Sequence, residues 1–299
     1  MNVQKFQHYV PRFHLARFVD RDGFLLVFDK TKGQTFRIKP ENIGGENRFY
    51  DLPELEQFGA ARTLMENQFA EIEAEAQRIT ACWLRQVKDH GRVEIPEPNR
   101  DIMSQFLTLQ LLRTSEARTV LLQFARLLQL SGDISANYDV KSDARSLHGA
   151  LLWDDQLIRD LSAKIADCIW IFAFNDSGQP FYTSDHPALV KSFDNKMWLL
   201  GPRLFDAGMY IVFPLTPEWV LYCKDREYWH KVAKFNQTVS PVRFTPDMVN
   251  HENSGQVCVC SRFVFSNSVD FSFAKEYCKL APGVVDNNRN RFKELPPLD

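Results

Sequence analysis

The most regular hydrophobic pattern lies in the first half of the chain. Apolar side chains recur every three or four residues from Met65 to Val87, which places them on one face of a helix, and Gly91 follows at a position suited to a helix stop. A second helical pattern begins after the sequence IPEPN and continues without an obvious break to about Leu130. These two patterns predict a pair of long antiparallel helices, and 144–167 predicts one or two more.

Shorter apolar segments predict strands on either side of these helices. Near the N-terminus, GFLLVFD and QTFRIK are joined by the turn-like KTKG and predict a β-hairpin. After Cys168, apolar and aromatic segments separated by turn residues predict strands at CIWIFAFND, FYTSD, KMWLL, MYIVFPL and WVLYCKD. Helical periodicity is predicted again over 245–266, where Thr245 suits an N-cap and Pro246 the first helical position. The segment FAKEYCKLA predicts a final helix.

This order of elements predicts an α+β fold. We expect an N-terminal β-hairpin, long antiparallel helices, and C-terminal antiparallel strands with a closing helix. The length of 299 residues allows one large domain, which we place at 1–285. Its helical part is expected at about 53–167, and its strand-rich part at about 168–225 together with the N-terminal hairpin. The tail 286–299 is polar and is predicted to be loose.

Composition and charge narrow the class of protein. A hydrophobic content of 44% with 25% charged residues is that of a globular protein, and 24 phenylalanines predict a sizeable core. A net charge of −2 argues against a protein that coats nucleic acid along its whole surface. The charge is uneven, because seven basic and three acidic residues lie between Arg12 and Lys39. Such a segment can hold a phosphate, although a solvated charged face is the commoner explanation.

No membrane segment or secretion signal is expected. The sequence MNVQKFQHYV has no apolar signal core, and no stretch approaches the roughly 20 apolar residues of a membrane span. The six cysteines lie mostly inside apolar segments, which is typical of reduced cysteines in a cytosolic protein. Cys258 and Cys260 lack a second pair at zinc-finger spacing, so we expect no metal there. We therefore expect a cytoplasmic protein.

The segment QHYVPRFHLARF, residues 7–18, is the strongest candidate for a functional site. Pro11 suits the first position of a short helix, so His8 lies just before a helix start. The first N–H groups of a helix lack internal partners, and a histidine and Arg12 beside them would suit an anion. With a pKa near neutrality, His8 could exchange a proton there. The alternative, which we weigh equally, is that His8 caps a turn and packs under Tyr9.

Other polar residues interrupt apolar segments further along the chain. Asp185 ends a predicted strand in FYTSDHP, where loops present catalytic groups, but it would equally suit a turn. Ser184 would be a nucleophile only with a base nearby, and no nucleophile-elbow glycines surround it. Arg113 interrupts an apolar helix and needs a partner. That partner is either a bound anion or, more simply, Asp185 or a helix glutamate.

Two glutamates on the first long helix leave open a binding site for a divalent metal ion. Glu66 and Glu73 are seven positions apart and share a helix face, so they could bracket a metal ion. Glutamates more often form a solvated face, with Arg62 and Arg78 as partners here. The chain has no phosphate-binding glycine loop and no dinucleotide fingerprint, since NIGGEN lacks the strand-to-helix setting.

Six ordered blocks resemble the family designated domain of unknown function 4238. The blocks are HYVPRFHLARF, FYDL, LLRTSEAR, FYTSDHP, FPLTPEWVL and SRFVFS, and the resemblance spans roughly residues 7 to 270. It implies a shared fold and a shared site, but no activity. The sequence differs from the family pattern at His14, where Tyr is common, and at His186, where Asn is common. Neither is expected to carry an essential proton, and we read His14 and Arg17 as surface or packing residues.

Two functional hypotheses follow. The first is a phosphodiesterase or nuclease-like hydrolase, by analogy a toxin or phage-defence effector, acting on a phosphate-containing substrate or nucleic acid. The residues assigned to its site are His8, Asp185 and Arg113 for catalysis and Arg12, Tyr9 and Ser184 for substrate binding. His8 would be general acid and base, facing Asp185 across an opening, and the two arginines would hold phosphate. The second hypothesis is a non-catalytic module that binds a small anionic ligand or a partner protein.

Overall fold

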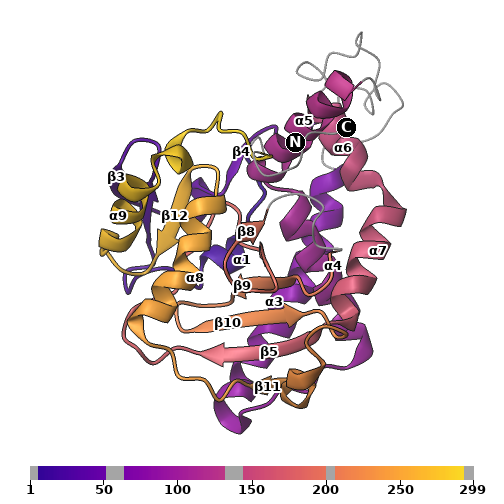
Figure 1. Cartoon of the computed structure of the whole chain (residues 1–299), viewed down its shortest axis with the longest axis vertical. Helices are drawn as coiled ribbons and strands as arrows, with labels where there is room; N and C mark the ends of the chain where they lie inside the picture. Colours follow the sequence, from indigo (N-terminus) through magenta and orange to yellow (C-terminus); the bar gives the residue numbers. More distant parts are fainter. Residues whose placement is uncertain (1–5, 52–63, 132–143, 200–205, 293–299) are drawn as a thin grey trace.

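The computed structural model describes residues 6–51, 64–131, 144–199 and 206–292. Within these ranges the fold class is α+β, as predicted, with a group of long helices beside the sheets and further helices packed among the strands (Figure 1). The α-helices are α1 (Arg12–Leu15), α3 (Leu64–His90), α4 (Glu97–Leu112), α5 (Ser115–Ser131), α6 (Ala144–Trp153), α7 (Asp155–Asp167), α8 (Pro246–Val259) and α9 (Ser272–Leu280). Short 3₁₀ helices are η1 (Pro40–Asn42), η3 (His230–Phe235) and η4 (Pro282–Val285). No helix among the described residues is long and apolar enough to cross a membrane.

The strands form three sheets within the described ranges. The largest has the order β11-β5-β10-β9-β7-β8 and is antiparallel except where β11 meets β5. Its strands are β5 (Ile169–Phe174), β7 (Leu189–Lys191), β8 (Trp198–Leu199), β9 (Tyr210–Pro214), β10 (Trp219–Lys224) and β11 (Thr238–Val239). A second sheet has the order β3-β2-β12-β6. Its strands are β2 (Leu25–Asp29), β3 (Gln34–Ile38), β6 (Thr183–Ser184) and β12 (Phe263–Ser266).

The predicted N-terminal hairpin is formed by β2 and β3, which pair antiparallel with Leu25 opposite Ile38. The third sheet, which the sequence did not predict, pairs β1 (Phe6–His8) with β4 (Gly45–Asn47). A glycine is required at this pairing, because a Cβ at Gly45 would lie 2.3 Å from the carbonyl oxygen of Gln7. The close approach of β1 and β4 therefore fixes the position of His8 at the end of β1.

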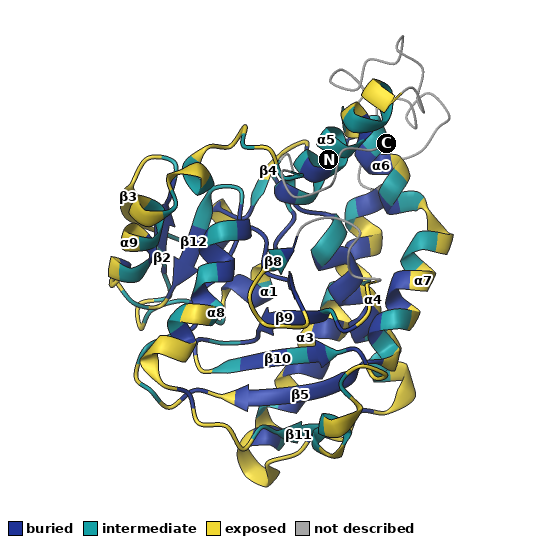
Figure 2. Cartoon of the chain, in the orientation of Figure 1, coloured by how far each residue is buried: buried dark blue, intermediate teal, exposed yellow. Residues whose placement is uncertain are grey.

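The core joins the long helices to the largest sheet. The apolar face predicted for α3 is buried at Met65, Phe69, Ala76, Ile79, Trp83 and Val87. Trp83 packs edge-to-face on Trp170 and Phe172 of β5, with ring centroids 5.7 Å apart in both pairs. Figure 2 shows that buried residues fill β9 and nearly all of β5, and that β10 combines buried and half-buried residues. Burial of this aromatic surface is a principal source of the stability of the fold.

The second predicted helix is broken into α4 and α5. Arg113 leaves the helical conformation at φ −94° and ψ 1°, and the Thr114 hydroxyl accepts a hydrogen bond from the Ala117 N–H at 3.2 Å. Thr114 thus caps the start of α5. The apolar positions keep their spacing across the break, which is why periodicity predicted one continuous helix.

The segment 245–266 is not helical throughout, because α8 ends at Val259 and β12 follows. The ammonium group of Lys30 binds the carbonyl oxygens of Val257 and Cys260 at 2.8 and 2.6 Å, which stabilises the C-terminal end of α8. The Asp185 carboxylate then accepts hydrogen bonds from the backbone N–H groups of 261–263 at 2.7 to 2.8 Å. These buried charges turn the chain out of the helix and into the sheet.

The first part of the segment predicted to be a loose tail contacts α5. Arg291 forms an ion pair with Glu116 of α5 at 2.8 Å, and the two side chains are 1% and 0% exposed. Arg289 pairs with the same carboxylate at 3.3 Å. A buried carboxylate needs such partners, so the tail covers a charge that α5 would otherwise leave unpaired. Residues 293–299 lie outside the described residues, and the single-domain boundary at 285 stays a prediction.

Candidate functional site

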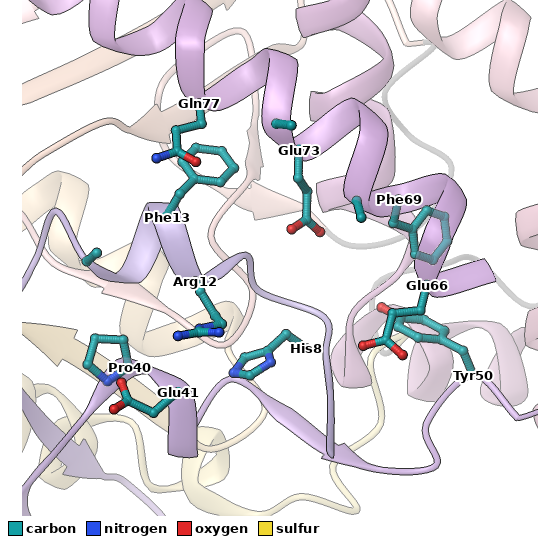
Figure 3. A pocket seen from close by; sticks show the side chains of 13 residues that line it. His8, Arg12, Phe13, Pro40, Glu41, Tyr50, Glu66, Phe69, Glu73 and Gln77 are labelled. Atoms are coloured by element: carbon teal, nitrogen blue, oxygen red, sulfur yellow. The ribbon is translucent and has the colours of Figure 1, made fainter. Parts of the chain in front are cut away.

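A cavity of about 530 Å³ lies between α1, η1 and α3 (Figure 3). Its polar lining consists of His8, Arg12, Glu41, Glu66, Glu73 and Gln77. Residues 69, 70, 73, 74 and 77 of α3 contribute to one wall, because positions three and four apart share a helix face. Ala70 and Ala74 are small, so this wall leaves space between its polar groups. The volume is within the range of small-ligand sites.

His8 enters the cavity from the end of β1 and retains an unused nitrogen. Its ring forms a hydrogen bond with the Pro40 backbone, while Nε2 is buried and has no hydrogen-bond partner. Burial lowers the pKa of His8 below its ordinary 6.5; the Pro40 bond and the Glu73 carboxylate oppose this, and the positive charges of Arg12 and Arg113 add to it. The imidazole is therefore neutral at neutral pH. A neutral imidazole with a free nitrogen can accept a proton.

Arg113 lies behind the cavity wall and holds one of the cavity carboxylates. Its guanidinium forms an ion pair with Glu73 at 2.7 Å, and its Nε donates to the Tyr9 carbonyl oxygen at 3.0 Å. The Arg113 side chain is 1% exposed and lies 5.1 Å from the Phe69 ring centroid. A helix glutamate, rather than Asp185, is thus the partner that the sequence required. Arg113 positions Glu73 and is not free to hold a phosphate itself.

The structure does not bring Asp185 to His8. Asp185 is buried outside the cavity, and its carboxylate accepts hydrogen bonds from the three backbone N–H groups of 261–263. Burial raises the pKa of Asp185 to about 6, and these N–H groups oppose the rise. Ser184 is also buried, with its hydroxyl 2.6 Å from the side-chain oxygen of Gln256. The predicted opening between an imidazole and Asp185 is therefore absent among the described residues, and we leave both residues out of the site.

Tyr9 and Arg12 follow His8 directly but have different positions. Tyr9 is buried against Phe49, with ring centroids 5.0 Å apart, and does not line the cavity. Arg12 is exposed and lines it. Helix α1 has only four residues, Arg12–Leu15, which is too short for the helix-start anion pocket that we expected. An anion would therefore be held by the Arg12 guanidinium rather than by helix N–H groups.

Glu66 and Glu73 do share a face of α3, and both line the cavity. Burial and the nearby charge of Glu73 raise the pKa of Glu66, while a hydrogen bond with Gln7 opposes the rise. Within the described ranges, however, no group of three or more His, Cys, Asp or Glu side chains is placed to hold a metal ion. The metal ion that the sequence left open therefore has no part in our proposal. Sequence reasoning missed Glu41 and Gln77.

Two other histidines are packing residues. His14 is fully buried, stacks on Phe213 at 4.9 Å, and has a pKa lowered to about 3 by burial. His186 is buried beside Thr114, at 2.5 Å, with a pKa lowered to about 4. Neither lines the cavity. That neither histidine carries an essential proton stays a prediction.

Comparison with known proteins places the chain in a family. Residues 7–270 match the sequence model of a family described as protein of unknown function (DUF4238). No curated protein and no solved structure gave a significant match. The matched range includes every residue that we have named in the lining of the cavity. Because the match covers most of the chain, the protein belongs to the DUF4238 family.

Proposed function

We propose that the protein is a nuclease-like phosphodiester hydrolase whose active site is the cavity between α1 and α3. The observation that carries this proposal is the unpartnered, buried Nε2 of His8 in a cavity that an arginine also lines. Histidine is the commonest general acid and base, and arginine is well suited to phosphoryl oxygens. Together they supply the two functions that phosphodiester hydrolysis needs most.

In the proposed reaction a water molecule attacks the phosphorus atom. His8 Nε2 accepts one proton of that water, and the bond from phosphorus to the leaving oxygen breaks. The leaving oxygen takes a proton from solvent, which yields an alcohol and a phosphate monoester, and His8 then returns its proton to solvent. Arg12 stabilises the negative charge that develops on the phosphoryl oxygens. Glu73, fixed by Arg113, favours the protonated form of His8 as it appears.

The second candidate is a non-catalytic module that binds its ligand in the same cavity. It is favoured by the cavity wall, because the ion pair of Glu73 with Arg113 would position a ligand without any chemistry. The two candidate functions place the ligand in the same cavity and differ only in whether the ligand is cleaved. Incubation with a dinucleotide, single-stranded RNA or bis-(p-nitrophenyl) phosphate would produce cleavage products only under the hydrolase proposal.

The proposal extends to the biological setting of the protein. All six cysteines are free, which fits a reducing compartment, so we place the protein in the cytoplasm. A role as a toxin or phage-defence effector rests on analogy. A phosphate-containing substrate or a nucleic acid would be its partner, and the proposal requires no membrane.

Filling the cavity should strongly lower activity without unfolding the protein. We expect the double substitution Ala70→Leu/Ala74→Leu to lower kcat/KM for phosphodiester cleavage by at least about 100-fold, because misplacing a substrate by ~1 Å costs that much. Both alanines are exposed, and leucine is a good helix former, so the melting temperature should change little. Ala81→Leu, at an exposed position of α3 outside the cavity, is the matched control. Full activity in the double variant would contradict the assignment of this cavity.

A further inference from the structure

The cavity has a basic end at α1. Arg12 lines this end, and Arg17, five residues further along the chain, has its guanidinium 5.1 Å from the centroid of the Phe13 ring. Arg17 also donates a hydrogen bond to the Gln77 carbonyl oxygen at 3.4 Å, and both Phe13 and Gln77 line the cavity. Glu41 is exposed at the same end, and Arg17 does not line the cavity itself, so Arg12 is the guanidinium that a ligand would meet there. This end suits an anionic group.

The opposite end of the cavity is acidic. Figure 3 shows Glu66 near Tyr50 and Phe69, on the far side of His8 from Arg12. The charges that act on Glu66 are those of Glu73 and Asp51, and both are negative. Since Arg113 pairs with Glu73, the Glu66 carboxylate, which also has a hydrogen bond with Gln7, is the group at this end that we expect to meet a ligand. This end therefore suits hydrogen-bond donors rather than a second phosphate.

Aromatic residues form the wall beside Glu66. Tyr50 and Phe69 both line the cavity, with ring centroids 5.2 Å apart; they are 4% and 6% exposed, so they contribute a small apolar surface rather than open stacking faces. Bases of single-stranded nucleic acids bind against such apolar and aromatic surfaces, and their Watson–Crick edges are then read by polar side chains. A cavity of about 530 Å³ has the size for one nucleotide unit.

We infer that the ligand of this cavity is a guanine nucleotide unit, with its phosphate at Arg12 and its base at Glu66. This inference rests on the proposed function, because it takes a phosphodiester substrate as given. The Watson–Crick edge of guanine presents two adjacent donors, N1–H and the N2 amino group, which one carboxylate can accept together. On the same edge, adenine, cytosine and uracil place an acceptor next to their donor. A carboxylate at Glu66 therefore selects guanine.

The test is a comparison of binding of GMP, IMP and AMP to the full chain by titration calorimetry. We expect GMP to bind roughly tenfold more tightly than AMP, the size of effect given by one bidentate contact to a base. IMP lacks the N2 amino group and should lie between them. Glu66→Gln, which replaces one acceptor oxygen with a donor, should bring GMP and AMP to within about threefold. Glu75→Gln, at an exposed position of α3 outside the cavity, should keep the preference.

Three results would overturn the inference: equal affinity for GMP and AMP, a preference that survives Glu66→Gln, or no binding of any of the three nucleotides. A GpU dinucleotide and an ApU dinucleotide then separate this inference from the proposed function. Cleavage of both at equal rates would overturn the guanine assignment and leave the hydrolase standing. GMP-selective binding without cleavage of either would overturn the hydrolase and leave the guanine site standing.

Discussion

Replacing Arg113 with methionine should destabilise the protein by about 3 kcal/mol, the lower part of the range for breaking a buried ion pair. The substitution removes the guanidinium that pairs with Glu73 and donates to the Tyr9 carbonyl oxygen. The Glu73 carboxylate and the Tyr9 carbonyl oxygen then lie unpaired beside the core. The cost lies at the low end because the Glu73 side chain is 24% exposed and can partly turn to solvent. Thermal unfolding should show a melting temperature lower by roughly 5–10 °C.

Two further variants show whether the ion pair is responsible. Arg78→Met breaks an exposed pair with Glu75 on the same helix and should cost at most about 0.5 kcal/mol. The double variant Arg113→Met/Glu73→Gln should be more stable than the sum of its single substitutions predicts, by about 1–3 kcal/mol. Strict additivity would show that the pair contributes no coupling, and Arg113 would then stabilise the fold by packing alone.

Replacing His8 with alanine should lower kcat/KM for phosphodiester cleavage by about 100- to 10,000-fold, the usual contribution of a general acid or base. The reason is that no other histidine lines the cavity in the part of the chain that the structure describes. The melting temperature should fall only slightly, because His8 Nε2 has no hydrogen-bond partner and the bond with Pro40 is the only one that the ring is shown to make among the described residues. Steady-state kinetics and thermal unfolding on the same preparation provide both values.

Histidines elsewhere in the chain are controls for this result. His230→Ala, at an exposed position of η3, should keep both activity and stability. His14→Ala should lose stability instead, because it removes a fully buried ring stacked on Phe213 and leaves the Thr183 hydroxyl without its partner. If His8→Ala resembled His14→Ala, with a large loss of melting temperature, His8 would be a structural residue.

Local sequence patterns predicted most of the helices and the N-terminal hairpin. The face of α3 follows from its spacing, and the hairpin of β2 and β3 follows from two apolar segments around a turn. The patterns failed where distant residues determine the local conformation. Strand β12 lies in a segment with helical periodicity, and Lys30 and Asp185, both remote in sequence, end the preceding helix. Periodicity carries no information about such partners.

The sequence predicted only part of the candidate site, again because local patterns do not show which distant residues meet. The segment that contains His8 and Arg12 was identified because its residue types are unusual together. Asp185 was assigned to the same site because it ends a predicted strand. A carboxylate at a strand end can equally bind backbone N–H groups, and Asp185 does so here. Glu66 and Glu73 were found from their spacing, but only the three-dimensional packing of α3 against α1 shows that they line the same cavity as His8.

The most direct test of the account is the pH dependence of kcat/KM for phosphodiester cleavage. If neutral His8 accepts the proton of the attacking water, kcat/KM should rise with pH through the His8 pKa, which lies below 6.5, and stay level above it. The groups facing that imidazole are Arg12, Arg113, Glu73 and the Pro40 backbone. The residual activity of His8→Ala should lack this acidic limb. An identical limb in His8→Ala, or a wild-type midpoint above 6.5, would contradict the assignment of His8 as the general base.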